Sequence, residues 1–256
     1  MHTSNSLAQS KEETELLEIL FQDEFMVAIH KPAGMLVHKS PIDKYETRYA
    51  MKILRNQIGQ WVYPIHRLDK PTSGLLLFAL HPEIAKKIGQ LFNDNQIKKQ
   101  YLAIVRGHTH PEGKIDHPLK EIAVFKHLAE QAQQKEAKDA CTDFKLIERY
   151  ELPFSDGRFE TSRYSMIQLF PKTGRKHQIR RHLKHISHPI IGDVKYGKGE
   201  HNRLFKDKLA SNRLLLAAQS MTFPHPNNNE EITLHCPLEK NFSDTLGKLR
   251  GAYLCK

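Results

Sequence analysis

His66-Arg-Leu-Asp-Lys-Pro-Thr-Ser-Gly74 runs without interruption into Leu75-Leu-Leu-Phe-Ala-Leu80, so a polar loop leads straight into an apolar segment. The apolar segment has the length of one buried strand and falls far short of the ~20 residues that a membrane-spanning helix needs. A polar loop fixed by a buried strand is a rigid support for functional side chains. The stretch therefore predicts a candidate site at the start of a core strand.

The candidate chemistry of this loop lies in Asp69, which follows Arg67 by two positions. A nearby guanidinium favours the ionised form of a carboxyl group, and a partly desolvated carboxylate can act as a nucleophile or as a base. Thr72, Ser73 and Gly74 add hydroxyl groups and a backbone that permits close approach of a ligand. An Asp beside an Arg is more often a structural ion pair, so the loop alone leaves both interpretations open.

The rest of the chain mixes strand-like and helical patterns without regular alternation. Residues 17–21 and 25–29 are predicted to form two strands joined by a tight polar turn, and a fixed turn follows at Lys31-Pro-Ala-Gly34. Helices are predicted at 46–60 and 82–95, and extended or strand-like segments at 61–65, 99–105, 142–150 and 162–170. This order favours an α+β fold with a mixed, mostly antiparallel sheet flanked by helices and loops.

A basic segment from Lys172 to His188 is predicted to form a helix that is entered through Thr173-Gly174. Its periodicity places an apolar seam (Ile179, Leu183, Ile186) beside a row of cations (Lys176, Arg180, Lys184). Residues 171–192 hold six Lys or Arg and no acid, and like charges four residues apart repel unless anions neutralise them. RNA phosphates would do so, although a solvated basic face is the commoner meaning of a charge run.

The domain organisation is simple, because the chain shows no repeat and no linker that would divide it in two. We expect a disordered N-terminal arm at residues 1–15 and one domain at 16–256. Residues 124–141 are predicted to form a surface excursion and 195–213 a basic loop, and neither receives a role. Residues 214–218 are expected to return to the core.

The charge balance indicates a polyanionic partner. Lys and Arg total 39 and Asp and Glu 29, so the formal net charge is +10 and the sequence pI is about 9.4. Nucleic acid and an acidic membrane surface both fit this excess. The three cysteines are widely spaced and odd in number, which argues against a disulfide framework and fits a reduced cytosolic compartment. The polar first ten residues lack the apolar region of a signal peptide.

Neither a metal nor a cofactor is expected. His177, His182, His185 and His188 lie close together in the sequence, but their helix offers no Cys, Asp or Glu to complete a ligand set. The chain also lacks G-x-x-x-x-G-K-[ST] and G-x-G-x-x-G, the phosphate-binding motifs of nucleotide cofactors. The histidines are therefore predicted to lie at the surface or to face phosphates.

Five segments together resemble the RluA family of pseudouridine synthases. They are Lys31-Pro-Ala-Gly34 with His38, His66-Arg-Leu-Asp-Lys-Pro-Thr-Ser-Gly74, Tyr101-Leu-Ala-Ile-Val-Arg-Gly107, Thr173-Gly-Arg-Lys-His-Gln-Ile-Arg180 and His188-Pro-Ile-Ile-Gly-Asp193. They occur in family order over roughly residues 17–236, and the HRLD-x-x-TSG element is highly specific. Stretches that begin at Leu36, Gly157 and Pro171 are most similar to the branch of the family that acts on tRNA. The resemblance implies a single catalytic domain with a cleft across the sheet and no S4-like RNA-binding domain.

The resemblance also implies roles for individual residues. Asp69 would be the catalytic carboxylate and Arg180 its ionic partner, although helix phase leaves Arg175 or Arg181 as alternatives. Tyr101 would stack on the target base, whereas from the residues alone it fits core packing equally well. Arg67 would help to open the RNA helix and hold the flipped nucleotide. Further substrate contacts are expected from His66, Thr72, Lys172, Arg175, Lys176, His177, Arg181 and Lys184.

The implied reaction is the isomerisation of uridine to pseudouridine, by resemblance at position 65 of certain tRNAs. It needs a nucleotide flipped out of its stack and no cofactor. Two routes stay open: attack of Asp69 on C1′, or assistance to elimination that gives a glycal. An rRNA target, a non-catalytic RNA-binding protein and a hydrolytic nucleosidase are the alternatives. We expect a cytoplasmic monomer that binds tRNA, without a membrane or an obligatory protein partner.

Overall fold

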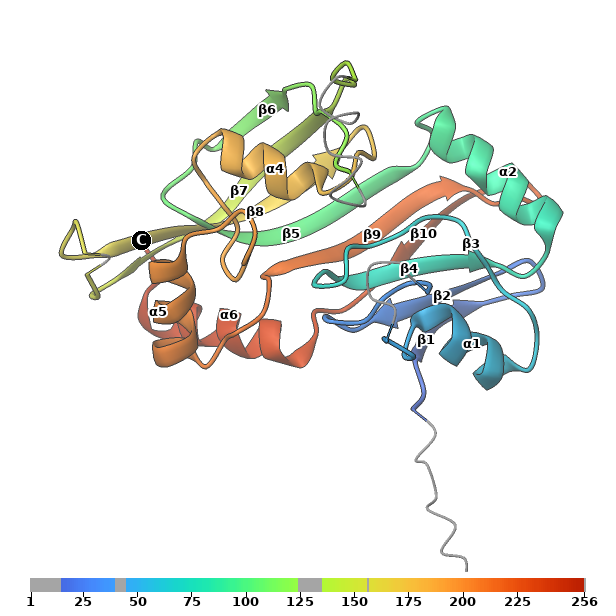
Figure 1. The fold of residues 1–256 in the computed structure, drawn as a ribbon, viewed down its shortest axis with the longest axis horizontal. Helices are drawn as coiled ribbons and strands as arrows, with labels where there is room; N and C mark the ends of the chain where they lie inside the picture. The colour runs from blue at the N-terminus through green and yellow to red at the C-terminus, as the bar shows by residue number, and fades with distance from the viewer. Residues whose placement is uncertain (1–14, 40–44, 124–134, 156, 256) are drawn as a thin grey trace, which may run out of the picture.

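The computed structural model describes residues 15–39, 45–123, 135–155 and 157–255, and Figure 1 shows their arrangement. The strands are β1 (Glu18–Gln22), β2 (Met26–Lys31), β3 (Tyr63–Pro64), β4 (Ser73–Ala79), β5 (Lys98–Arg106), β6 (Glu112–Asp116), β7 (Cys141–Leu152), β8 (Ser162–Pro171), β9 (Leu216–Pro224) and β10 (Glu231–His235). The helices are α1 (Ala50–Ile58), α2 (Pro82–Asn93), α4 (Gln178–His185), α5 (Gly199–Leu209) and α6 (Lys240–Ala252).

All the described strands form one sheet in the order β1-β2-β4-β9-β5-β8-β7-β6, with β10 paired to β9 and β3 to β4. The pairings are antiparallel except for the short parallel contact between β4 and β9. Helices flank this sheet on both sides (Figure 1). The predicted α+β fold with a mixed, mostly antiparallel sheet is therefore confirmed.

The parallel contact between β4 and β9 depends on Gly74, the last residue of the loop at residues 66–74. Gly74 pairs with Ala218 of β9 and has a φ of +114°, a conformation that L side chains rarely adopt. A Cβ at this position would lie 2.1 Å from the carbonyl oxygen of Ala218. Glycine is therefore required where the two halves of the sheet meet.

Alternation along β5 decides which helices lie on which face of the sheet. Leu102 and Ile104 belong to an apolar cluster with residues of α5 and α6. Ala103 and Val105 point to the opposite face and belong to a cluster with residues of α4. Tyr101 packs against that second cluster, so it shares a face with α4.

Several predicted elements match the structure closely. The strands predicted at 17–21 and 25–29 form the antiparallel pair β1 and β2, and the helix predicted at 82–95 is α2. The apolar run after the loop is β4, in which every residue is buried. The helix predicted at 46–60 is shorter, because Tyr49 is extended and Gly59 has a left-handed conformation.

Two predictions for the basic half were wrong. The helix predicted from Lys172 begins only at Gln178, because His177 has a φ of 56° and interrupts it. Lys176 therefore does not share a helix face with Arg180 and Lys184. The basic loop predicted at 195–213 contains α5, a helix whose buried side chains include Phe205.

Two predicted segments fall largely on residues that the structure does not describe, and three observed elements were not predicted. Most of the predicted N-terminal arm and residues 124–134 of the predicted excursion lie outside the described residues. The sequence analysis identified no counterpart of β6, β10 or α6. Within the described ranges, no helix combines the length and the apolar character needed to cross a membrane.

Candidate active site

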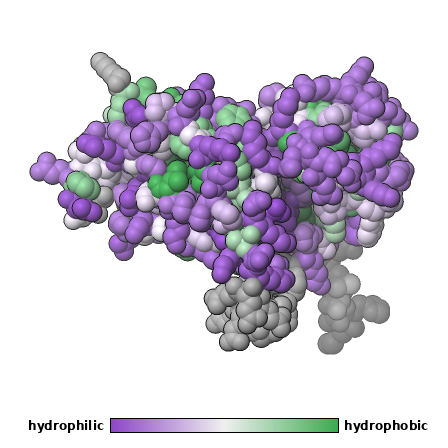
Figure 2. All heavy atoms as spheres, turned by 90° about the horizontal axis from the view of Figure 1, so that it is seen from above, coloured by the Kyte–Doolittle hydropathy of each residue, from purple (hydrophilic) through white to green (hydrophobic). Residues whose placement is uncertain are grey.

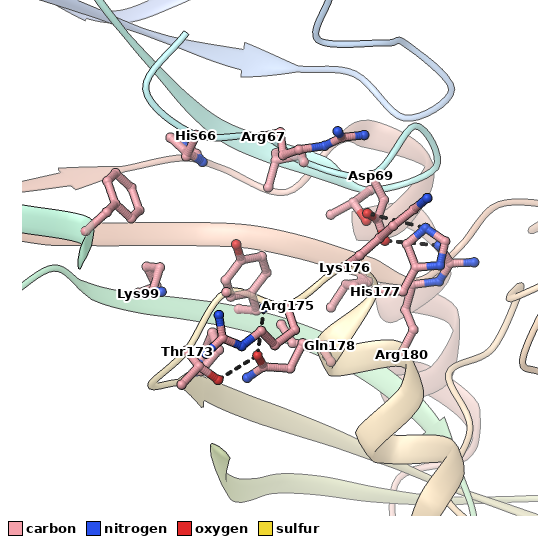
Figure 3. Close-up of a pocket in the computed structure, with 18 of the residues that line it drawn as sticks. His66, Arg67, Asp69, Lys99, Thr173, Arg175, Lys176, His177, Gln178 and Arg180 are labelled. Carbon is pink, nitrogen blue, oxygen red and sulfur yellow. Dashed lines mark hydrogen bonds and ion pairs between the residues drawn. The ribbon is translucent and has the colours of Figure 1, made fainter. Parts of the chain in front are cut away.

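A pocket of about 600 Å³ opens beside the quoted loop, between the start of β5 and residues 171–180 (Figure 3). Its wall also includes the end of α2 and Leu216 of β9. Nine of the twelve predicted site residues line it: His66, Arg67, Asp69, Thr72, Tyr101, Arg175, Lys176, His177 and Arg180. Segments far apart in the sequence thus converge on one cavity.

The pocket contains the contact between Arg180 and Asp69 that the sequence analysis expects. Arg180 Nη1 donates to Asp69 Oδ2 at 3.0 Å. From behind, Arg180 Nε and Nη2 donate to the two carboxylate oxygens of Asp193 at 2.7 and 2.9 Å. The Asp69 side chain is 21% exposed, against 7% for Arg180 and 1% for Asp193. Asp69 is therefore the end of this chain of charges that substrate can reach.

Mutual contacts keep the inner pair ionised. Burial alone would favour the neutral form of Arg180, but the hydrogen bonds to Asp193 and Asp69 raise the pKa of its guanidinium. Burial also opposes the charge of Asp193, and the bonds from Arg180 nevertheless lower the pKa of that carboxyl group. Asp193 accepts further bonds from the backbone N–H groups of Lys195 and Tyr196, at 2.9 and 3.0 Å. The bidentate pair thus fixes the direction of the guanidinium.

His177 lies beside the carboxylate in a neutral state. Its Nε2 is 3.8 Å from Asp69 Oδ1, and its Nδ1 is 2.9 Å from the hydroxyl oxygen of Tyr196. Burial is the main cause that lowers the pKa of His177 to about 4. The left-handed backbone conformation at His177 aims its ring towards the pocket (Figure 3). Near neutral pH it therefore adds polarity but no charge next to Asp69.

Tyr101 and His66 supply ring surfaces to the wall. Burial, with a smaller contribution from the charge of Asp69, raises the pKa of Tyr101, so its phenol stays protonated. His66 Nε2 accepts a hydrogen bond from the backbone N–H of Leu77 at 3.1 Å. Its ring stacks on Phe92 with centroids 5.4 Å apart, and burial lowers its pKa to about 3. Neither ring carries a charge near neutral pH.

The loop itself is held in shape from two sides. The backbone N–H of Thr72 donates to the carbonyl of Asp69 at 3.0 Å, which closes a tight turn. Lys31 has no exposed surface, and its ammonium donates to the carbonyls of Pro32, Met35 and Lys70 at 2.8, 2.8 and 3.3 Å. The Lys31-Pro-Ala-Gly34 turn is thereby attached to the loop that carries the carboxylate.

The predicted cationic residues separate into two groups. Arg67 and Lys176 line the pocket, and so does Arg175, whose Nε donates to the carbonyl of Asp139 at 3.0 Å. Three others lie outside the pocket wall. Lys172 pairs with Asp143 at 3.1 Å, Arg181 donates to the carbonyl of Lys120 at 2.9 Å, and Lys184 lies 5.9 Å from the ring centre of Tyr196.

Sequence reasoning missed three residues of the site: Asp193, Tyr196 and Lys99. Asp193 lies at the end of a quoted motif and is the first acid after a long basic segment, which was an available signal. Tyr196 and Lys99 carried no such signal, because their positions depend on contacts across the fold. Within the described ranges, no group of His, Cys, Asp or Glu is arranged to hold a metal ion.

Comparisons with known proteins agree with this geometry. Residues 25–185 match the family model described as RNA pseudouridylate synthase. The chain is 48% identical over 225 residues to tRNA pseudouridine synthase C of Vibrio parahaemolyticus serotype O3:K6, covering 87% of this chain and 91% of the relative. It is 46% identical over 234 residues to the protein of that name from Haemophilus influenzae, covering 91% and 98%.

Two solved human structures have a similar fold. RNA Pseudouridylate Synthase Domain Containing 4 superposes with a TM-score of 0.70 at 25% identity, covering 93% of this chain and 94% of that one. RNA Pseudouridylate Synthase Domain Containing 1 gives 0.66 at 24% identity, covering 96% and 100%. The family model covers more than half of the chain, and the curated relatives match it over most of their length. The chain therefore belongs to the RNA pseudouridylate synthase family, the RluA-type family that its sequence motifs indicate.

Proposed function

We propose that this protein isomerises uridine to pseudouridine in tRNA, by similarity at position 65 of certain tRNAs. The observation that carries the proposal is the partly exposed carboxylate of Asp69, held by a buried, fixed Arg180 at the wall of a pocket. Relatives that are 46–48% identical over most of the chain are named tRNA pseudouridine synthase C, which supports tRNA over rRNA as the substrate.

The proposed reaction exchanges one bond to the sugar for another. The N1–C1′ bond breaks, the base rotates, and C5 bonds to C1′. The proton on C5 leaves and N1 takes up a proton, so no atom is gained or lost overall. Because the glycosidic bond of a stacked nucleotide is inaccessible, the nucleotide must first be flipped into the pocket. Asp69 then either attacks C1′ or assists elimination to a glycal.

Each lining residue receives a role that fits its environment. Arg180 holds Asp69 ionised and oriented, and it is itself held by Asp193. Tyr101 offers a protonated aromatic ring on which the target base can stack. Arg67 is exposed at the pocket mouth, where it can take the place of the flipped nucleotide. His66, Thr72 and His177 shape the wall, while Arg175 and Lys176 meet phosphates.

The surroundings of the pocket suit a polyanion. Viewed from above, the molecule presents a mostly hydrophilic face indented between two lobes (Figure 2). Lys172, which follows β8, and Arg181 and Lys184 of α4 lie outside the pocket and would extend the RNA contact beyond it. With a net charge of +10, the protein is suited to bind tRNA directly. We infer that it acts in the cytoplasm as a monomer, without a membrane or an obligatory protein partner.

The test uses tRNA with tritium at C5 of its uridines. Isomerisation releases one tritium per pseudouridine and leaves the RNA mass otherwise unchanged, and carbodiimide mapping then locates the site. Loss of the base would indicate a hydrolase instead, and binding without release would indicate a non-catalytic protein. Mapping tRNA and rRNA from a strain that lacks the protein decides between the two RNA classes.

A further inference from the structure

Lys99 is a residue of the pocket that the proposed reaction does not use. It lies on β5 two positions before Tyr101, so both side chains project to the same face of the sheet and line the same cavity. Figure 3 shows Lys99 and His66 at one end of the pocket and Asp69 and Arg180 at the other. The pocket therefore extends well beyond the carboxylate.

The ammonium of Lys99 lacks an anionic partner among the described residues. Its Nζ lies 5.7 Å from the ring centre of Phe92, and its charge contributes to the lowered pKa of His66, which is a neutral neighbour and not a counter-ion. Asp69 is the one acid in the pocket wall, and Arg180 already occupies it. Burial lowers the pKa of Lys99, which means that its charge is poorly solvated. A half-buried cation without a counter-ion costs stability unless a ligand supplies one.

The surroundings of Lys99 are suited to a nucleotide backbone. The stacked rings of His66 and Phe92 form one side, and the polar residues Asn93 and Asn95 at the end of α2 line the same part of the pocket. His66 is neutral and so adds no competing charge. RNA carries one phosphate per nucleotide, and an ammonium binds phosphate as a compact point charge.

We propose that Lys99 anchors a second subsite, which holds a backbone phosphate adjacent to the flipped target nucleotide. This inference rests on the proposed function, because the ligand is the same RNA chain. The phosphate contact would fix the nucleotide backbone at one end of the pocket while the base lies near Asp69 and Tyr101 at the other. Lys99 would then contribute to substrate affinity and placement, not to bond cleavage.

Lys98 provides a matched control. It precedes Lys99 on β5, but its side chain is 78% exposed and pairs with Glu231 at 3.2 Å on the far side of the sheet. Lys99→Met and Lys98→Met each remove one charge and keep an unbranched side chain. The two variants therefore have the same net charge and differ only in which side of the sheet has lost its cation.

The first measurement is single-turnover tritium release across a range of salt concentrations. Loss of one phosphate contact should lower the log–log salt slope by about 0.7–0.9 and raise the half-saturating protein concentration about 5- to 8-fold near 0.1 M salt. The maximal rate should stay within about 3-fold for Lys99→Met. Lys98→Met should match the wild type in both. Equal effects of the two variants would overturn the proposal, since they would reflect net charge alone.

The second measurement identifies the phosphate. Neutral methylphosphonate linkages are placed one at a time next to the target uridine in a tRNA stem-loop. One linkage should weaken binding to the wild type about 5- to 8-fold and should weaken binding to Lys99→Met hardly at all, because the same contact is already lost. If every neutral linkage weakens binding to the wild type and to Lys99→Met by the same factor, Lys99 does not contact a phosphate and the proposal fails.

Two controls separate the possible failures. If the wild type releases no tritium from any tRNA, the proposed function fails. If the wild type is active and Lys99→Met has the same half-saturating concentration and salt slope, only the proposed subsite is refuted. Chemical denaturation tests a structural role for the side chain. Lys99→Met should be as stable as the wild type or more so, because it removes a poorly solvated charge. Marked destabilisation would assign Lys99 to packing instead.

Discussion

At the scale of single residues, the site is a chain of alternating charges that becomes progressively less exposed from Asp69 through Arg180 to Asp193. The innermost carboxylate does not line the pocket, yet its bidentate contact with Arg180 determines where the guanidinium points. Of the two carboxylates, only Asp69 is exposed to the pocket. Substitutions at the two ends should therefore have different consequences.

Asp69→Asn should abolish tritium release while leaving the fold and most of the tRNA affinity intact. The amide keeps the shape of the side chain and removes the charge to which we assign the attack or assistance at C1′. Circular dichroism and equilibrium tRNA binding serve as the controls. Turnover by an Asp69→Asn preparation free of wild-type enzyme would contradict the assignment.

Asp193→Asn should lower both stability and rate. The change removes the buried carboxylate of the chain and leaves Arg180 with Asp69 as its remaining anionic partner, which costs about 3 kcal/mol of unfolding free energy. A misdirected guanidinium should lower kcat about 100-fold with little change in KM, because substrate binding does not involve Asp193. Asp143→Asn is the control, since its ion pair with Lys172 is exposed and is worth at most about 1 kcal/mol. A raised KM at unchanged kcat would place Asp193 in substrate binding instead.

At the scale of elements, the predictable parts are those governed by local pattern. The polar loop before β4 and the helix α2 follow from apolar runs and periodicity in the sequence. The late start of α4 does not, because His177 interrupts the helix with a left-handed backbone and the side chain of Gln178 accepts hydrogen bonds from the hydroxyl of Thr173 and the backbone N–H of Arg175. These features convert the predicted first turns of the helix into a loop.

The same distinction applies to the site. Asp69 and its contact with Arg180 could be predicted, because a family motif marks the first and the apolar seam orients the second. Lys99 and Tyr196 could not, since their roles arise from tertiary contacts with no signature at short range, whereas Asp193 had a signal in its motif that the sequence analysis did not use. The predicted basic loop failed for a similar reason: Phe205 of α5 is buried by its packing in the cluster that also holds α6.

Gly74→Ala tests the junction between β4 and β9. The added Cβ would collide with the backbone of Ala218 in a conformation that alanine rarely adopts. We expect a loss of about 3 kcal/mol in unfolding free energy and a fall in activity, because the displaced strand carries the Asp69 loop. Gly89→Ala within α2 is the matched control, since its Cβ would meet nothing within 4 Å. It should stabilise the protein by about 0.5–1 kcal/mol, and equal destabilisation by both would argue against a special role for the junction.

At the scale of the whole molecule, a chain with a net charge of +10 carries two partly buried, neutral histidines in its pocket. Burial lowers the pKa of His177 to about 4 and that of His66 to about 3. In the unfolded chain both would take up protons below about pH 6.5. Between pH 6.5 and 4 the unfolded state therefore binds more protons than the native state, and the stability of the fold must fall as the pH falls.

His66→Gln and His177→Gln should each make the stability of the protein less sensitive to acid. The wild type loses unfolding free energy as the pH falls from about 6.5 towards 4, by about 2 kcal/mol for each histidine after allowance for partial exposure. Glutamine does not titrate, and at position 66 its side-chain oxygen can still accept the hydrogen bond from the backbone N–H of Leu77. Urea denaturation at several pH values measures the slope for all three proteins. Lower stability of a variant at pH 7.5 does not affect the test, because the pH dependence is the readout. Slopes equal to that of the wild type would show that these two rings are not the groups that resist protonation.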